Sequence, residues 1–400
     1  MNTSKGAQLS FMMFLQYFIW GAWYVSMNSY MATNLQSTGQ QISYAYMALA
    51  IATMISPIFV GMVADKYFAA QKIMGVLHLV GAGTLLLATT TTSNTVFIGI
   101  VLFYSLLYMP TIALSNSVAF TQMQDPTKQF PLIRMFGTVG WIFSGILISN
   151  LLEVEKTHFI FIIAAAASTI LGMYSFLLPN TPPPAKDTSM SASQALGADA
   201  LVLFKDRPYT VFFVAAVLIC IPLSFYYGFA NLFLNEAGME NAAGKMIYGQ
   251  ISEGLFILAI PLLLNRIGVK KMLILGMGAW VIRYILFAYG NSGDNLWMLY
   301  GGIILHGICY DFFFVTGYLY TERKAGEKIK SAAQGLFTFA TYGLGMVIGT
   351  LFSGMVADHF TANGQRVWSS IWMVPVYIAA AVLVYFILAF RDRKQTDVNA

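Results

Sequence analysis

The sequence predicts an all-α membrane protein of twelve transmembrane helices, which form two six-helix bundles with both termini in the cytoplasm. Three observations lead to this prediction. The composition is too apolar for a soluble domain, apolar runs of membrane-spanning length recur along the whole chain, and the basic residues collect in alternate loops.

The chain is 58% hydrophobic and only 10% charged, with a mean hydropathy of +0.68. An ordinary soluble domain has about a quarter of its residues charged. The net charge of +5 comes from basic residues in short loops between apolar runs, so it reports orientation in a lipid bilayer. We therefore expect no nucleic-acid partner.

Twelve apolar runs approach or exceed the length of about 20 residues that a span requires. The longest polar interruption, residues 180–208, divides them into six and six. This predicts an N-terminal six-helix bundle (1–179), a cytoplasmic linker (180–208) and a C-terminal six-helix bundle (209–400). The predicted spans are 9–32, 42–65, 72–92, 95–122, 130–151, 157–179, 209–234, 244–265, 271–290, 295–321, 331–356 and 367–390.

The loop charges give an independent test of this topology. With a cytoplasmic N-terminus, seventeen of the 22 lysines and arginines lie inside, three lie outside and two lie within spans. Cytoplasmic loops are enriched in basic residues, so both termini are expected on that side. The halves also correspond at an offset of about 200 residues, as parallel repeats do, since Asp65-Lys66 falls opposite Asn265-Arg266.

A permanently charged arginine, Arg134, lies inside the fifth predicted span. At helical spacing Arg134, Thr138 and Trp141 share one face, which combines a cation, a hydroxyl and an indole. An intramembrane charge of this kind usually marks a substrate or ion pathway. The alternative is that Arg134 only extends its side chain to the cytoplasmic interface.

Glu253 lies about nine residues into the eighth span, roughly 13 Å deep at ~1.5 Å per residue. An ionised carboxylate at that depth is costly, so we expect Glu253 to handle a proton or a substrate. Gln250, one turn earlier, offers hydrogen bonds beside it. A purely structural ion pair is the alternative for Glu253.

Asp311 in the tenth span and Arg283 in the ninth both fall near mid-membrane, so they are expected to pair with each other. If they pair, Glu253 is the better proton carrier. If Arg283 instead faces Glu253, Asp311 takes that role.

His306 precedes Tyr310 by one turn on the same side of the tenth span, where it is either a packing residue or a proton relay. Among many aromatic residues, Trp141 and Tyr227 are the two that we expect to stack on a planar ligand. No second histidine and no pair of cysteines stands at metal-ligand spacing near His306, and no nucleotide-binding loop or catalytic triad is evident. The sequence therefore predicts neither an enzyme, nor a metal site, nor a cofactor.

The loop between the second and third spans resembles the signature of the major facilitator superfamily. Gly61, Asp65, Lys66 and Lys72 carry this resemblance, although Phe68 stands where that signature normally has a glycine. In that superfamily the loop latches the cytoplasmic side, so the resemblance implies a gating role for these four residues.

Seven further segments resemble the bacterial nucleoside:proton symporter family of that superfamily, in the same order and across nearly the whole chain. They are FLQYFIWGAW from Phe14, YMPTIALSNS from Tyr108, FPLIRMFGTVGW from Phe130, GQISEGLFILAIP from Gly249, IRYILFAYG from Ile282, HGICYDFFFVTG from His306 and SAAQGLF from Ser331.

This resemblance implies proton-coupled nucleoside uptake through a bacterial inner membrane by a monomer in the lipid bilayer. It implies a central binding site between the halves, built from Arg134, Thr138, Trp141, Tyr227, Gln250, Glu253, His306 and Tyr310, with Glu253 and Asp311 as candidates for proton coupling. Two departures leave the preferred base open. Ser224 and Tyr227 replace an amide pair, and His306 replaces a tyrosine.

Two other functions fit the same residues. A sugar or glycoside:proton symporter would also use Trp141, Gln250 and Arg134 to hold a ring with hydroxyl groups. A transporter-like receptor would bind a nucleoside without moving it.

Overall fold

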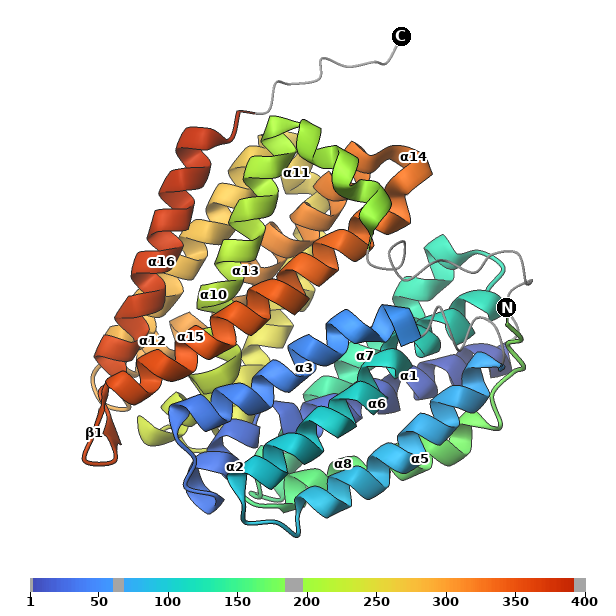
Figure 1. The fold of residues 1–400 in the computed structure, drawn as a ribbon, viewed down its shortest axis with the longest axis horizontal. Coiled ribbons are helices and arrows are strands. Elements are labelled where there is room, and N and C mark those ends of the chain that lie inside the picture. Colours follow the sequence, from blue (N-terminus) through green and yellow to red (C-terminus); the bar gives the residue numbers. More distant parts are fainter. Residues whose placement is uncertain (1–2, 60–67, 184–196, 392–400) are drawn as a thin grey trace.

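The computed structural model describes residues 3–59, 68–183 and 197–391, and this part of the chain is almost entirely helical (Figure 1). Only helices and closed barrels satisfy every backbone polar group within lipid, which accounts for helices along such apolar runs. The elements before residue 180 are α1 (Thr3–Tyr24), α2 (Met27–Asn34), α3 (Gly39–Phe59), α5 (Ala70–Ala88), α6 (Asn94–Gln122), α7 (Pro126–Gly145), the π-helical η2 (Ile146–Leu151) and α8 (Phe159–Ser175).

The elements after residue 197 begin with a short 3-10 helix and end with a long C-terminal helix. They are η4 (Ala198–Lys205), α10 (Arg207–Glu236), α11 (Ala242–Tyr289), α12 (Leu296–Ile304), α13 (His306–Tyr310), the π-helical η5 (Asp311–Val315), α14 (Thr316–Thr338), the π-helical η6 (Phe339–Gly345), α15 (Met346–His359), the two-residue strands β1 (Thr361–Ala362) and β2 (Gln365–Arg366), which pair antiparallel, and α16 (Trp368–Ala389).

Helices lie over the predicted spans wherever the chain is described. Within residues 3–59, 68–183 and 197–391, eight helices are long and apolar enough to cross a membrane. The long α11 covers two predicted spans, 244–265 and 271–290, with a break at Gly268 between them (φ 77°, ψ 168°). Glycine reaches such a positive φ without a steric penalty, so the chain turns there.

Of the four predicted gating residues, the structure describes only Lys72, which is exposed in the first turn of α5. Gly61, Asp65 and Lys66 lie outside the described residues.

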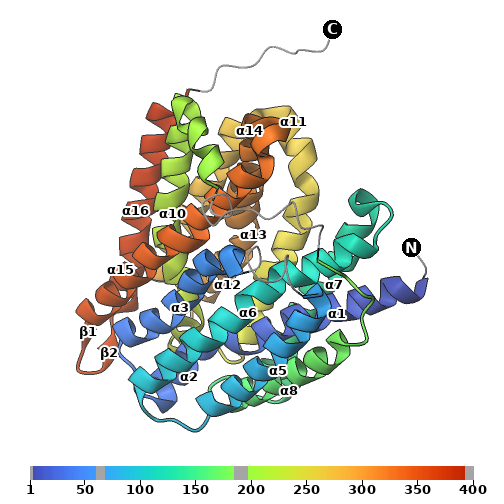
Figure 2. The same ribbon diagram turned by 45° about the vertical axis from the view of Figure 1, so that its right-hand side comes forward.

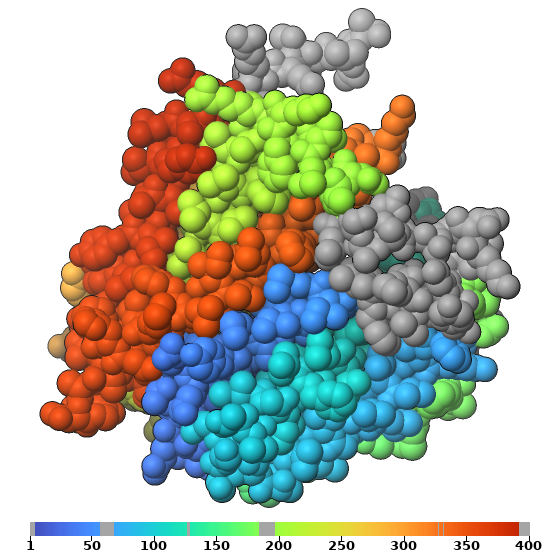
Figure 3. All heavy atoms as spheres, in the orientation of Figure 1, coloured from blue at the N-terminus to red at the C-terminus, as the bar shows by residue number. Residues whose placement is uncertain are grey.

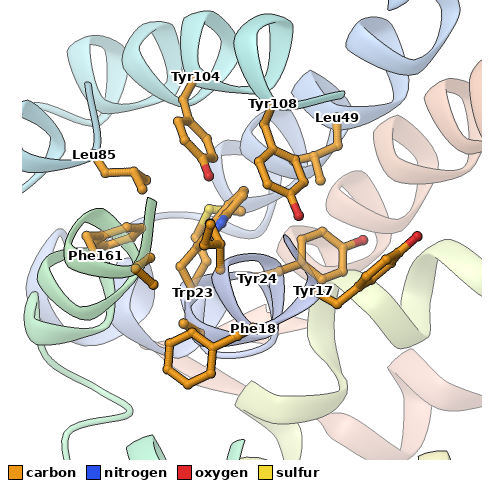
Figure 4. Close-up of a cluster of buried hydrophobic side chains, with 14 of the residues drawn as sticks. Tyr17, Phe18, Trp23, Tyr24, Leu49, Leu85, Tyr104, Tyr108 and Phe161 are labelled. Carbon is orange, nitrogen blue, oxygen red and sulfur yellow. The ribbon is translucent and has the colours of Figure 1, made fainter. Parts of the chain in front are cut away.

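The buried apolar side chains form two large clusters, one mostly from residues 9–178 and the other mostly from residues 200–390. Figure 4 shows part of the first, where Trp23 lies among Leu85, Tyr104 and Phe161. The two groups of helices diverge toward the end where α1 begins and α16 ends (Figures 1 and 2). The molecule is therefore two packed bodies that meet at one end.

At the meeting end, α3 of the first half lies along α15 of the second in a continuous seam (Figure 3). The Asp358 carboxylate at the end of α15 accepts hydrogen bonds from the backbone N–H groups of Gly39 (2.5 Å) and Gln40 (3.0 Å), which begin α3. A helix N-terminus has unpaired N–H groups and a partial positive charge, so an acidic side chain stabilises it.

A second cap joins the same two halves with their roles reversed, because here the acid belongs to the first half and the capped helix to the second. Glu155, just after η2, accepts hydrogen bonds from the Ala243 backbone N–H at the start of α11 (3.0 Å) and from the Ser149 hydroxyl (2.5 Å). Positions 155 and 358 are separated by 203 residues, and so are positions 40 and 243. Each half thus supplies one acid that caps a helix of the other half, at matching positions of the repeat.

Gly140 permits the close approach of α1 and α7 within the first half. A Cβ at this position would lie 2.1 Å from the carbonyl oxygen of Phe14, a distance that no side chain can occupy. Since the atom in the way is backbone, only a movement of one helix would relieve the overlap. This approach places Arg134 and Tyr17 beside each other.

We expect Gly140→Ala to destabilise the protein by ~1–3 kcal/mol, the usual cost of overpacking. Gly83→Ala on α5 is the matched control, because no atom of another described helix lies within 4 Å of the Cβ it would add. Thermal unfolding of the detergent-solubilised protein measures both. Equal melting temperatures for the two variants would contradict the assigned packing.

Candidate functional site

A cavity of about 230 Å³ is lined by residues of both halves. All eight residues that the sequence predicts for substrate binding line it. From the first half these are Arg134, Thr138 and Trp141, and from the second half Tyr227, Gln250, Glu253, His306 and Tyr310. The structure therefore brings together side chains from α7, α10, α11 and α13 that are up to 176 positions apart, from 134 to 310.

On the wall formed by the first half, the guanidinium of Arg134 lies over the ring of Tyr17, with its Cζ 3.9 Å from the ring centroid. An arginine stacked on an aromatic face is held by a cation–π interaction while its N–H groups stay available. Trp141 meets Trp20 edge-to-face at 5.6 Å between centroids. This wall is thus a fixed cation beside a rigid aromatic surface.

On the wall formed by the second half, three side chains form a row that leads away from the cavity. Glu253 Oε2 lies 3.8 Å from His306 Nε2, and His306 Nδ1 accepts a hydrogen bond from Arg283 Nη1 at 3.0 Å. Glu253 is the most open of the three, with 35% of its side chain exposed, whereas His306 and Arg283 are buried. Across the cavity, Glu253 faces Arg134.

The predicted ion pair between Arg283 and Asp311 is wrong. Arg283 contacts His306 instead, and neither carboxylate oxygen of the fully buried Asp311 has a hydrogen-bond partner among the described residues. Asp311 follows His306 by five positions, which turns its side chain by roughly 140° around a helix. The structure pairs Arg283 with His306.

Asp311 also does not line the cavity. It begins the π-helical segment η5, directly after Tyr310. An unpaired carboxylate is expensive to ionise in an apolar environment, so Asp311 remains a candidate for carrying a proton, although it has no direct contact with the cavity.

Several cavity residues were not predicted from the sequence. Tyr342 donates a hydrogen bond to the hydroxyl of Tyr310 (2.5 Å), and Tyr46 donates one to the backbone oxygen of Tyr24 (2.6 Å). Both are tyrosines within apolar runs. A buried phenol hydroxyl needs a hydrogen-bond partner, and this need is the sequence feature that could have indicated them. The other lining residues are Tyr17, Trp20, Tyr24, Leu49, Ala50, Thr53, Met109, Gly137 and Met346.

This arrangement suits a small, partly aromatic and partly polar molecule. Indole and phenol rings offer stacking surfaces, while Gln250, Thr138 and the charged groups offer hydrogen bonds. Within the described part of the chain, no group of three histidine, cysteine, aspartate or glutamate side chains is placed to hold a metal ion.

Comparisons with known proteins identify the family of this chain. The profile of the nucleoside H+ symporter family matches residues 1–395. The chain is 41% identical to the putative nucleoside transporter YegT of Escherichia coli K12 (96% of this chain, 94% of the relative) and 36% identical to the xanthosine permease of the same organism (97% and 96%).

The fold is similar to the crystal structure of the nucleoside transporter NupG. The TM-score is 0.90 at 32% sequence identity, and the match covers 98% of this chain and 100% of that one. With the family profile spanning nearly the whole sequence and close relatives that are all transporters, the chain belongs to the nucleoside H+ symporter family.

Proposed function

We propose that the central cavity binds a nucleoside and that the protein carries it into the cell together with a proton. The observation that supports this proposal most directly is the convergence of Arg134, Thr138 and Trp141 with five residues of the other half on one cavity. The nucleoside-transporting relatives give the substrate class. In this proposal Trp141 and Tyr227 stack on the base, and Gln250 and Thr138 bind polar groups.

The architecture that we propose for this function has twelve spans and cytoplasmic termini. The two buried clusters support a division into bundles 1–179 and 209–400, joined by a cytoplasmic linker at 180–208. The break at Gly268 supports counting α11 as two spans. The basic residues of the loops support the orientation. In this proposal the protein acts as a monomer in the inner membrane of a bacterium.

Transport would proceed by rocking of the two bundles around the cavity. The halves diverge toward the end where α1 begins and α16 ends, which in this orientation is the cytoplasmic end (Figures 1 and 2). At the other end the caps formed by Asp358 and Glu155 join the halves. We therefore assign this structure to an inward-facing state, closed on the outside by these two caps.

Proton coupling requires a group that is neutral in one part of the cycle and charged in another. Glu253 meets this requirement best, because it lines the cavity, faces Arg134 and lies beside His306. Asp311 is the second candidate.

The substrate class can be tested by uptake of labelled nucleosides into proteoliposomes. We expect unlabelled purine and pyrimidine nucleosides to compete, and free sugars to have no effect. Exchange of internal nucleoside for labelled external nucleoside separates a transporter from a receptor, since a receptor binds but does not exchange. Competition by sugars alone would favour the sugar symporter and contradict our proposal.

We expect Glu253→Gln to abolish accumulation against a gradient and to keep nucleoside exchange, because the amide preserves hydrogen bonding but cannot carry a proton. Uptake driven by an imposed pH gradient measures the first, and counterflow without a gradient measures the second. Asp311→Asn is the comparison. Loss of accumulation in that variant together with normal accumulation in Glu253→Gln would transfer the role to Asp311.

The caps can be tested with the double variant Glu155→Ala, Asp358→Ala. The variant Ile148→Cys, at a buried position beside the closed end, reports opening of that end. The native cysteines are removed in the same protein by Cys220→Ala and Cys309→Ala. Loss of charged hydrogen bonds at both caps should raise labelling by a membrane-impermeant maleimide roughly tenfold or more.

Glu236→Ala is the matched control for this experiment. Glu236 accepts hydrogen bonds from Arg366 (2.6 Å) and Trp368 (2.9 Å), but all three residues belong to the second half. Its loss should leave the labelling rate unchanged. Equal labelling of the double variant and the control would show that the caps do not hold the outside closed.

A further inference from the structure

Arg283 is a fully buried cation without a carboxylate partner among the described residues. Its guanidinium lies over the ring of Tyr226, 3.5 Å from Cζ to the centroid, and Nη1 donates to His306 Nδ1 at 3.0 Å. Nε and Nη2 have no hydrogen-bond partner in the described part of the chain. The imidazole of His306 is therefore the group toward which this buried charge directs its hydrogen bond.

The chemistry of this hydrogen bond fixes the protonation pattern of the imidazole. A guanidinium can only donate, so Nδ1 of His306 must accept with its lone pair. A neutral imidazole has one proton, and with Nδ1 occupied that proton is on Nε2. Tyr226 stacks on the ring, 5.1 Å between centroids, and limits its rotation. Nε2 faces the cavity, 3.8 Å from Glu253 Oε2.

We propose that Arg283 is a positioning residue that holds His306 in the Nε2–H tautomer, so that this ring is a permanent hydrogen-bond donor directed into the cavity. His306 then neither gains nor loses a proton during transport. This differs from both readings of His306 that the sequence allows, a packing residue and a proton relay.

In this proposal the Nε2–H group of His306 serves two acceptors in turn, the carboxylate of Glu253 and the substrate. At 3.8 Å the Nε2–Oε2 distance exceeds a hydrogen bond, so a small movement of the Glu253 side chain, or a water molecule, completes the contact when the carboxylate is ionised. Once a proton binds Glu253, that carboxyl no longer needs the donor. The Nε2–H group is then free for an acceptor atom of the substrate, such as a carbonyl oxygen, ring nitrogen or hydroxyl.

Binding of the proton and of the substrate are thereby linked through one N–H group. This part rests on the proposed function, whereas the tautomer itself does not. Groups that face His306 and Glu253 from the surrounding elements also enter any pH profile: Arg283 on α11, Tyr226 and Tyr227 on α10, Cys309 and Tyr310 on α13, Asp311 on η5 and Arg134 on α7.

The tautomer can be observed directly by nitrogen-15 NMR of protein labelled at its four histidines. The spectrum of His306→Gln identifies the signal of His306 by its absence. We expect Nε2–H in the wild type and in Arg283→Lys, which keeps a donor-only group, and a mixture of tautomers in Arg283→Met. An Nδ1–H signal in the wild type, or an unchanged tautomer in Arg283→Met, would overturn the proposal.

Transport kinetics test the consequence for the substrate. Losing one hydrogen bond should raise KM for the nucleoside about tenfold in His306→Phe and in Arg283→Met. His306→Gln, which retains an N–H donor, should recover part of that affinity, with a KM between those of the wild type and His306→Phe, and its uptake should still respond to an imposed pH gradient.

A double-variant cycle decides whether Arg283 acts through His306. In the His306→Phe background, Arg283→Met should raise KM no further. Additive effects, or loss of proton-driven accumulation in His306→Gln with exchange intact, would refute the proposal. If the wild type moved no nucleoside, the proposed function would fail, while the NMR result would still decide the tautomer.

Discussion

The charge of an arginine cannot be removed in a protein, and this constraint shapes the centre of the molecule. Each half stacks one such charge on a tyrosine of its own first long helix: Arg134, which lines the cavity, on Tyr17 of α1, and the fully buried Arg283 on Tyr226 of α10. Between them lies one cavity carboxylate, Glu253. Protonation of this carboxylate therefore changes the net charge at the centre of the molecule. An uncharged ligand adds no charge of its own, so this net charge depends on the proton.

Much of the fold could be predicted from apolar runs and loop charges, because a lipid environment leaves the backbone few alternatives to helices. The break at Gly268 lay where the sequence separates two spans, since Gly-Val-Lys-Lys interrupts the apolar run. The π-helical segments η2, η5 and η6 were not predicted. They add one residue per turn without a distinct composition, so apolar periodicity does not detect them.

The cavity residues on α7 and α11 were predictable because a charged or amide side chain within an apolar span is costly and usually has a function. The partner of Arg283 was not predictable, because burial and opposite charge favour Asp311 while the rotation of the helix decides for His306. Tyr46 and Tyr342 were missed for a related reason. A tyrosine does not interrupt the apolar pattern of a span. Only the packing of the helices shows where its hydroxyl points.

The reciprocal caps have a consequence for what can reach the cavity. In the proposed orientation and transport cycle, opening of the outer end would take from Glu155 and Asp358 their N–H partners, Ala243 in one case and Gly39 and Gln40 in the other. Two free carboxylates would then flank the entrance, one from each half. Such a negatively charged entrance would attract protons and repel phosphate groups. It would therefore favour a nucleoside over its phosphorylated form before either molecule reaches Arg134.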